Sequence, residues 1–134
     1  MTTTITRRAA CTCGQLSATC EGEPVRRSMC HCSSCQRRTG SVFGVQARFP
    51  RERVHVDGRA TEFSRIADSG NRITFHFCPT CGTTLYWMIE SDPSLVAVAV
   101  GAFADPSFPA PHVSVYEARR HGWALAPDDA EHID

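Results

Sequence analysis

The six residues Phe77-Cys78-Pro79-Thr80-Cys81-Gly82 place two cysteines in a turn-forming context, with two residues between them. Proline presets one backbone dihedral of such a turn, and glycine lets the backbone pass close to the sulfur atoms. Structural zinc takes four Cys or His ligands, so two thiolates held in this way form half of a tetrahedral site. The motif therefore predicts a zinc knuckle that needs two further ligands from elsewhere in the chain.

Two other groups of cysteines are candidates for completing this site. Cys11 and Cys13 are followed by Gly14, so this pair resembles a second knuckle. The segment Cys30-His31-Cys32-Ser33-Ser34-Cys35 offers three thiols, enough to bind an ion by itself. Spacing alone does not decide which group completes the first pair. If the two knuckles join, the three thiols remain, and zinc with three protein ligands and one open position is typical of a catalytic site.

The eight cysteines could instead form four disulfides, because their number is even. Disulfides need an oxidising compartment, however, and residues 1–13 lack the apolar run that follows the basic residues of a secretory signal. We therefore expect a cytoplasmic protein whose clustered thiols bind metal. Cys20 lies in an alternating segment, residues 15–20, and is expected to be a small buried hydrophobic residue and not a ligand.

Length and charge exclude several classes of protein. The chain has 134 residues, of which 42% are hydrophobic and 21% charged, and this fits one folded domain over residues 1–134. Fourteen arginines balance fourteen acidic residues, so we expect no general affinity for nucleic acid or for an anionic membrane. The longest apolar run, residues 95–100, is far shorter than the roughly 20 residues of a membrane-spanning helix.

The hydrophobic periodicity predicts a mainly β protein. Residues 72–77 alternate apolar and polar side chains, as a half-buried strand does, and 95–100 is typical of a strand buried on both faces. Further strands are predicted at 15–20, 42–49, 54–56 and 85–89. Only 33–38 is predicted to be helical, with its amides directed at the nearby thiols. The acidic segment 124–134 is expected to be loose. The expected core aromatics are Phe75, Phe77, Trp87 and Trp123.

The cysteines fall into three motifs along the chain. They are Cys11-Thr12-Cys13-Gly14, then Cys30-His31-Cys32-Ser33-Ser34-Cys35 followed by Arg37-Arg38-Thr39-Gly40-Ser41, then Phe77-Cys78-Pro79-Thr80-Cys81-Gly82. This order resembles the glutathione-dependent formaldehyde-activating enzyme family, which shares its domain with centromere protein V. Weaker matches follow at 98–106 and 109–113, so the resemblance covers residues 11–123.

The resemblance implies a fold like that of the Mss4-like proteins, in which small packed antiparallel sheets surround a structural zinc. It implies that this closed site has four ligands, Cys11, Cys13, Cys78 and Cys81. It also implies a second, catalytic zinc with three ligands, Cys30, Cys32 and Cys35. The implied activity is that of a carbon–sulfur lyase similar to S-(hydroxymethyl)glutathione synthase, which adds glutathione or another small thiol to formaldehyde or a related aldehyde.

Several alternatives stay open from the residues alone. The chain could be a non-catalytic, zinc-stabilised interaction module, or a redox protein that uses the three clustered thiols. His31 is either a proton shuttle or a residue turned outward by its neighbouring ligands. Arg37 and Arg38 either hold a substrate carboxylate or are solvated at the surface. His76 or His112 could act as a fourth ligand and close the three-thiol site.

Overall fold

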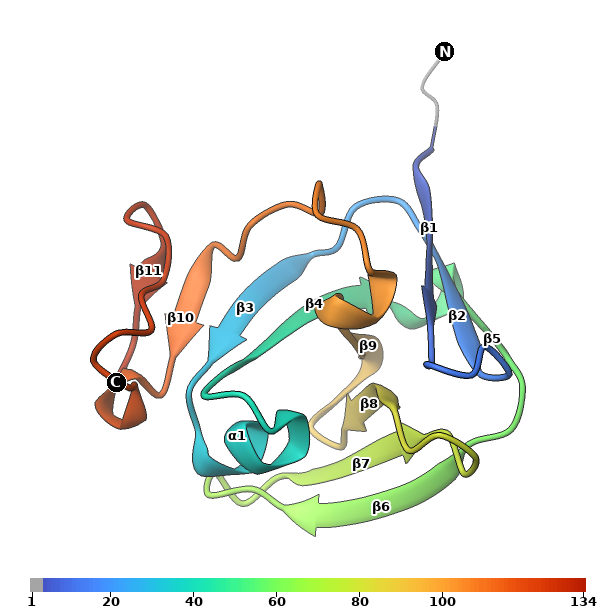
Figure 1. The fold of residues 1–134 in the computed structure, drawn as a ribbon, viewed down its shortest axis with the longest axis horizontal. Helices are drawn as coiled ribbons and strands as arrows, with labels where there is room; N and C mark the ends of the chain where they lie inside the picture. The colour runs from blue at the N-terminus through green and yellow to red at the C-terminus, as the bar shows by residue number, and fades with distance from the viewer. Residues whose placement is uncertain (1–3) are drawn as a thin grey trace.

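Strands dominate the architecture of the computed structural model, which describes residues 4–134 (Figure 1). The strands of the smaller sheet are β1 (Thr6–Ala10), β2 (Ser17–Glu21) and β5 (Val54–Asp57), in the order β1-β2-β5. Those of the larger sheet are β3 (Arg26–Cys30), β4 (Gly44–Pro50), β6 (Thr61–Ile66), β7 (Arg72–Phe77), β8 (Thr84–Ile89), β9 (Asp92–Ala99), β10 (Val113–Val115) and β11 (Glu131–His132). Their order is β11-β10-β3-β4-β9-β8-β7-β6. The prediction of a mainly β fold is confirmed.

Segments with a clear hydrophobic pattern are the ones that sequence analysis placed correctly. Strand β7 has the predicted bounds, and β2, β4, β5 and β8 lie within two residues of theirs. Strand β9 begins three residues before the predicted 95–100, and Val100 already starts a 3₁₀ turn, Val100–Phe103. The analysis missed β1, β3, β6, β10 and β11, because their polar residues or short length hide the alternation.

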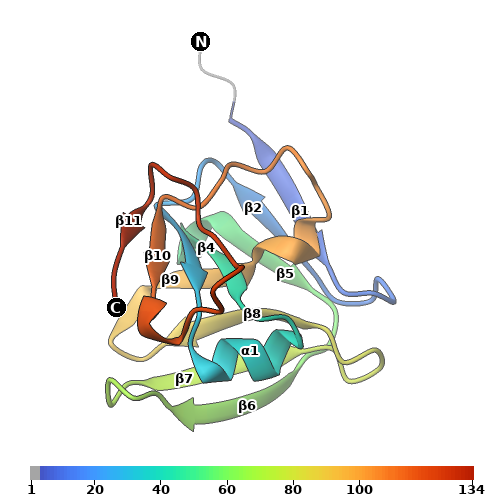
Figure 2. The same ribbon diagram turned by 60° about the vertical axis from the view of Figure 1, so that its left-hand side comes forward.

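The larger sheet curls around the single α-helix of the described residues, α1 (Ser33–Thr39). Strands β3 and β4 lie on one side of this helix and β6 and β7 on the other, as Figure 1 and Figure 2 both show. Neighbouring strands are antiparallel, as expected, except that β10 is parallel to both β3 and β11. The expectation of small sheets thus holds for the three-stranded sheet only, since the other has eight strands.

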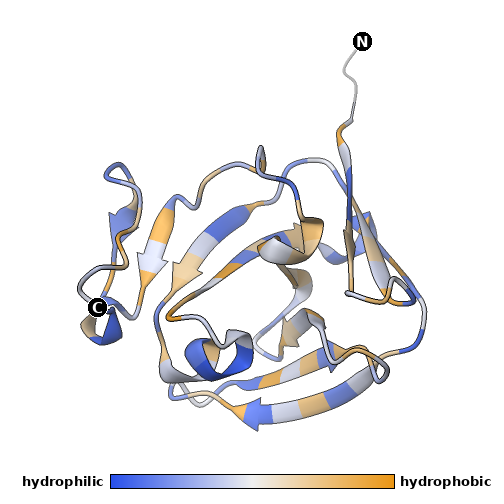
Figure 3. Ribbon diagram, in the orientation of Figure 1, coloured by the Kyte–Doolittle hydropathy of each residue, from blue (hydrophilic) through white to orange (hydrophobic). Residues whose placement is uncertain are grey.

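The hydrophobic core lies between the smaller sheet and the middle of the larger one. Its fully buried members include Leu16 and Ala18 from β2 and the turn before it, and Phe49, Leu85 and Val98 from the strands opposite. Cys20 is also fully buried in this core, as predicted. Figure 3 shows hydrophobic and hydrophilic residues alternating along β6 and β7, the part of the larger sheet that extends beyond the core.

Helix α1 is capped at its start by Cys32, the second thiol of the Cys30–Cys35 segment, and at its end by a glycine. The Cys32 side chain caps the first turn, because its sulfur accepts a hydrogen bond from the Cys35 amide at 3.3 Å. Gly40 ends the helix in the left-handed conformation (φ 73°), and its amide donates to the Gln36 carbonyl at 2.8 Å. The predicted helix, 33–38, is confirmed, and it delivers Cys35 beside Cys32.

Two expectations about the C-terminal part are wrong. The segment 124–134 is not loose, because β11 pairs with β10 and the Ile133 amide donates to the Ser114 carbonyl at 2.8 Å. Trp123 is 73% exposed and lies outside the core, whereas Trp87 is buried as predicted. Within residues 4–134, no helix combines the length and the apolar character needed to cross a bilayer.

Candidate metal centres and the adjoining pocket

Four of the predicted ligands converge where the smaller sheet meets the loop after β7. A turn closed by the Gly14 amide on the Cys11 carbonyl (3.0 Å) presents Cys11 and Cys13. A second turn, closed by the Gly82 amide on the Cys78 carbonyl (2.8 Å), presents Cys78 and Cys81. The four sulfur atoms lie within 4.8 Å of one another. We call this group the four-cysteine cluster.

The four-cysteine cluster has the dimensions of a tetrahedral zinc site. Sulfurs about 2.3 Å from a central ion lie roughly 3.8 Å apart along the edges of the tetrahedron. The Cys13 sulfur is 3.6 Å from those of both Cys11 and Cys78. The Leu16 amide donates to the Cys11 sulfur at 3.3 Å, as a thiolate requires. The hydrogen bonds from Thr83 lower the pKa of Cys81 to about 5. The donor set therefore fits zinc.

Three further thiols form a second, separate group, the three-cysteine cluster. Cys30 ends β3, Cys32 caps α1 and Cys35 lies in its first turn, so strand and helix aim three sulfurs at one point, all within 4.8 Å. Hydrogen bonds from the Cys30 and Cys35 thiols lower the pKa of Cys32, whereas the hydrogen bonds of Cys30 with Cys32 and Cys35 raise the pKa of Cys30. No His, Asp or Glu among the described residues joins them, so three ligands fit a zinc with one open position.

All eight cysteines fall within residues 4–134, and each is a free thiol. The structure thus brings together the predicted groups of four and three and leaves Cys20 apart in the core. Their assignment as metal ligands stays a prediction that this geometry supports. The proposed fourth ligands do not take part: His76 stacks on Tyr86, with ring centroids 4.3 Å apart, and His112 is exposed at the surface.

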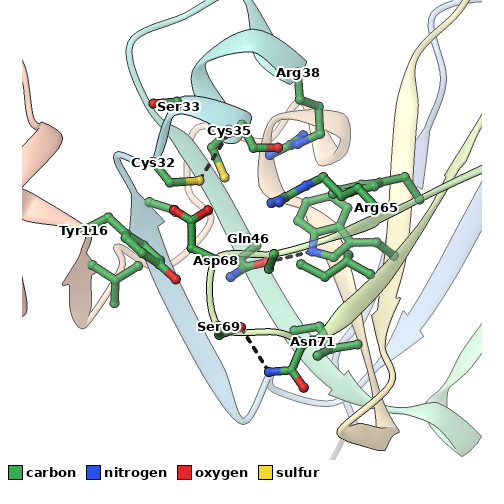
Figure 4. A pocket seen from close by; sticks show the side chains of 18 of the residues that line it. Cys32, Ser33, Cys35, Arg38, Gln46, Arg65, Asp68, Ser69, Asn71 and Tyr116 are labelled. Atoms are coloured by element: carbon green, nitrogen blue, oxygen red, sulfur yellow. Dashed lines mark hydrogen bonds between the residues drawn. The ribbon is translucent and has the colours of Figure 1, made fainter.

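A pocket of about 770 Å³ opens directly in front of the three-cysteine cluster (Figure 4). Its walls come from α1, β4, the loop 67–71 between β6 and β7, and the segment around Tyr116. Trp87 lies in its floor, and the indole Nε1–H donates to the Gln46 side-chain oxygen at 3.0 Å. At its rim, Arg119 forms an ion pair with Asp68 at 3.1 Å. The open side of the three-cysteine cluster therefore faces a space large enough for a small organic molecule.

Arginines make the pocket strongly basic. Arg38 lines it and stacks over Trp87, with 4.3 Å from the guanidinium carbon to the ring centroid, while Arg37 is exposed at its edge. The alternative in which both arginines are merely solvated is therefore wrong for Arg38. Arg48 from β4 and Arg65 from β6 also line the pocket. Sequence analysis missed both. Phe63 and Arg65 are two residues apart, and this spacing could have placed these two side chains on one face of a strand.

His31 neither points outward nor lines the pocket, although it lies between two cysteines of the cluster. Its side chain is fully buried, and Nε2 is hydrogen-bonded to the Ser114 hydroxyl at 2.9 Å. Glu117 lies 3.8 Å from the same nitrogen and also pairs with His132. Burial lowers the pKa of His31, although Glu117 partly opposes this shift. The residue therefore fixes the β3–α1 turn against β10, and the outward orientation considered from sequence is wrong.

A mainly β fold, two thiol clusters that fit zinc, and a pocket at one of them define a small β protein with a candidate metal-dependent site. The chain belongs to the glutathione-dependent formaldehyde-activating enzyme family, because the model of this family matches residues 6–119. The resemblance stated from the cysteine motifs is thereby confirmed.

Individual relatives are similar over part of their length. The chain is 32% identical over 85 residues to a Fusarium vanettenii protein and 29% identical over 85 residues to one from Penicillium rubens. Both are provisionally named glutathione-dependent formaldehyde-activating enzymes. Each match covers 63% of this chain but only 45% and 44% of the relatives, so the chain spans less than half of their length. A crystal structure of a Rhodobacter sphaeroides protein has the same fold, with a TM-score of 0.55 and 21% identity over 76% of this chain and 90% of that one.

Proposed function

We propose that the chain is a zinc-dependent carbon–sulfur lyase that adds a small thiol, such as glutathione, to formaldehyde or a related aldehyde. One observation carries this proposal. Three thiols converge with an open side on a pocket, and they are separate from the four thiols that could hold a structural ion. The names of the family and of the relatives supply the substrate class, glutathione and formaldehyde.

The reaction forms one carbon–sulfur bond. The thiol sulfur attacks the aldehyde carbon, the carbon–oxygen π bond breaks, and the proton that leaves the sulfur ends on the new hydroxyl oxygen. The cluster of Cys30, Cys32 and Cys35 would hold the zinc, and when bound this ion would lower the pKa of a thiol substrate. Three thiolates suit a soft sulfur ligand better than activation of water, so hydrolysis is a poorer match to this donor set.

The pocket's own side chains bind and orient the reactants. Gln46 is fixed at both ends, because its oxygen accepts from Trp87 and its nitrogen donates to Ser28 at 3.0 Å. The rings of Phe75 and Trp87, with centroids 5.5 Å apart, give the floor an apolar surface against which a carbon chain can pack. Holding thiol and aldehyde together in such a space removes much of the entropic cost of their encounter.

Exchange NMR on the zinc-loaded protein tests this function, since it reports the interconversion of thiol, formaldehyde and adduct at equilibrium. We expect the protein to accelerate the exchange of glutathione or of another small thiol. Cys32→Ser should abolish the acceleration, while Cys20→Ala, a change in the core away from the pocket, should retain it. The proposal fails if zinc-loaded protein accelerates exchange for no pair of small thiol and aldehyde.

The two alternatives from the sequence give different results in the same experiment. An interaction module would show no acceleration while keeping its metal. A redox protein would instead form a reversible disulfide among Cys30, Cys32 and Cys35, detectable as a loss of two free thiols when the protein is treated with a mild oxidant.

A further inference from the structure

We propose that Arg38 and Arg65 together bind a carboxylate group of the substrate, on the wall of the pocket beside the three-cysteine cluster. The ligand class is therefore a thiol or an aldehyde that carries a carboxylate. This inference rests on the proposed function, because the carboxylate belongs to a reactant of that site.

The two guanidinium groups reach the pocket from different elements. Arg38 extends from α1 over Trp87, and Arg65 extends from β6 toward Phe75, with 5.8 Å from its guanidinium carbon to the ring centroid. Figure 4 shows both side chains directed into the pocket near Cys35. Gly44 makes room for one of them, because a Cβ at this position would lie only 2.7 Å from an Arg38 terminal nitrogen. The fold thus holds two like charges on one wall.

Within residues 4–134, neither guanidinium has an acidic partner. In the described part of the chain, the arginines that pair with Asp or Glu are Arg7, Arg72, Arg119 and Arg120. Arg38 and Arg65 make no such pair there, and the Nε atom of each is buried without a hydrogen-bond acceptor. Buried polar groups in folded proteins nearly always find a partner, and two neighbouring cations repel each other. An anion between them would remove both costs.

The clustered thiols do not supply enough negative charge to satisfy these arginines once they hold zinc. Three thiolates and one Zn²⁺ carry a net charge of −1, whereas Arg38 and Arg65 carry +2. Two further arginines and two aspartates that line the pocket add equal charges of both signs: Arg48, Arg119, Asp68 and Asp92. At least one positive charge is therefore left for a ligand to match. The three cysteines of the cluster line the same pocket as Arg38 and Arg65. A bound anion would thus lie beside the three-cysteine cluster.

A carboxylate suits this site better than a neutral group. A guanidinium stacked on an aromatic ring keeps its planar N–H edge free, and this edge matches the two oxygens of a carboxylate. Ser34, which lines the pocket with both arginines, adds a hydroxyl donor. Phe75 and Trp87 in the floor of the same pocket provide an apolar surface for a short carbon chain that links the carboxylate to the reacting end.

Isothermal titration of the zinc-loaded protein with 3-mercaptopropionate and with its methyl ester tests the proposal. The two ligands share the thiol and the carbon chain, and the methyl ester removes the negative charge of the carboxylate. We expect the acid to bind about 10-fold or more tightly than the ester, since a hydrogen bond to a charged group is worth about 1.5–3 kcal/mol. Arg65→Gln and Arg38→Gln should each reduce this preference several-fold. Arg51→Gln, on an exposed 3₁₀ turn that does not line this pocket, is the matched control and should leave it unchanged.

The outcomes separate this inference from the proposed function. Equal affinity for acid and ester, or a preference that persists in the double variant Arg38→Gln/Arg65→Gln, overturns the carboxylate site but leaves thiol binding intact. If neither compound binds, the exchange experiment with glutathione and other thiols decides about the proposed function, and propionate decides about the arginines. Propionate should protect Arg38 and Arg65 from phenylglyoxal, read by peptide mass spectrometry, and a lack of protection overturns the inference. Thermal melting checks that every variant is folded.

A series of aldehydes identifies which reactant carries the charge. Glyoxylate and its methyl ester differ in the carboxylate in the same way as the two thiols do. If the acid is preferred among the thiols and not among the aldehydes, the arginines recognise the thiol. The reverse result assigns the carboxylate to the aldehyde, and a preference in neither series overturns the proposal.

Discussion

The amide of Cys35 and the sulfur of Cys32 are joined by a hydrogen bond of 3.3 Å that serves two purposes at once. It caps the first turn of α1, and it favours the thiolate form of Cys32. Formation of this helix therefore assembles the three-cysteine cluster, whereas the four-cysteine cluster depends on two turns that are 65 residues apart in the chain.

This difference predicts distinct effects of cysteine substitutions on metal content. We expect two zinc ions per chain in protein purified without chelator, and one in Cys30→Ser/Cys32→Ser, which should stay folded because its four-cysteine cluster is intact. Elemental analysis gives the stoichiometry and circular dichroism the fold. Cys20→Ala is the control and should retain both ions. A single ion in wild type and double variant alike would contradict the assignment.

A pair of glycine substitutions should separate backbone strain from a steric clash. Gly58 and Gly70 both have positive φ, 98° and 89°, so alanine costs about 1–2 kcal/mol at either position. A Cβ at Gly58 would also lie 1.9 Å from the Gln15 carbonyl oxygen, while at Gly70 it would meet no atom within 4 Å. We expect Gly58→Ala to lower the free energy of unfolding by at least about 2 kcal/mol more than Gly70→Ala does in urea titrations.

The same substitution should disturb the four-cysteine cluster. The side-chain nitrogen of Gln15 donates to the Cys78 sulfur at 3.0 Å, and its side-chain oxygen accepts from the backbone amide of Arg59. The turn at Gly58 therefore holds Gln15 beside the cluster. Zinc should accordingly be lost to a chelator faster from Gly58→Ala than from Gly70→Ala. Equal rates and equal stability in the two variants would show that the turn relaxes without effect.

Protonation of His76 should make the fold less stable in acid. Burial lowers its pKa in the folded protein below the ordinary value of 6.5, against an opposing effect of Glu62. The unfolded chain then binds a proton that the folded chain does not, so the free energy of unfolding falls as the pH drops below about 6.5. His76→Phe keeps a ring to stack on Tyr86 and removes the titrating group.

Urea unfolding between about pH 7.5 and 5.5, with excess zinc to hold metal occupancy constant, measures this effect. The decrease in stability over this range should be smaller in His76→Phe than in the wild type. Parallel curves for the two proteins would assign the acid sensitivity to other groups.

Gly44→Ala should displace Arg38 without removing its charge. The new methyl group would contact a terminal nitrogen at 2.7 Å, at the end of a flexible side chain that can move aside. We expect a change in stability of less than about 1 kcal/mol, because Gly44 has an ordinary strand conformation. The preference for 3-mercaptopropionate over its ester should nevertheless fall, as titration can show. An unchanged preference would mean that Arg38 binds no carboxylate.

The features that sequence analysis placed correctly are those encoded locally. The cysteine spacings predicted the groups of thiols, because each motif is one turn whose proline, glycine or helix start fixes the direction of its sulfurs. The pairing of Cys11 and Cys13 with Cys78 and Cys81 did not follow from spacing and came from the resemblance to the family. The alternation in β7 likewise marks a strand within six residues, although its most buried side chain is His76 and not one of the apolar residues.

The features that were missed depend on tertiary structure. Strand β6 is exposed along most of its length, so no side of it is marked as buried. The spacing of Phe63 and Arg65 could indicate a shared face but not that this face borders a pocket. Contact between Arg38 and Trp87 joins residues from α1 and β8 that only the curled sheet brings together. The burial of His31 depends on Ser114, 83 residues later in the chain.

The loop 67–71 at the pocket rim could change during evolution while the two thiol clusters stay as they are. It contributes Ala67, Asp68, Ser69 and Asn71 to the pocket, contains no cysteine, and is closed by its own hydrogen bonds, such as that from the Ala67 amide to the Asn71 carbonyl at 2.8 Å. Its length and composition can therefore change with little strain on either thiol cluster. Directed evolution confined to these five positions would be a direct route to altered substrate selectivity on an unchanged metal framework.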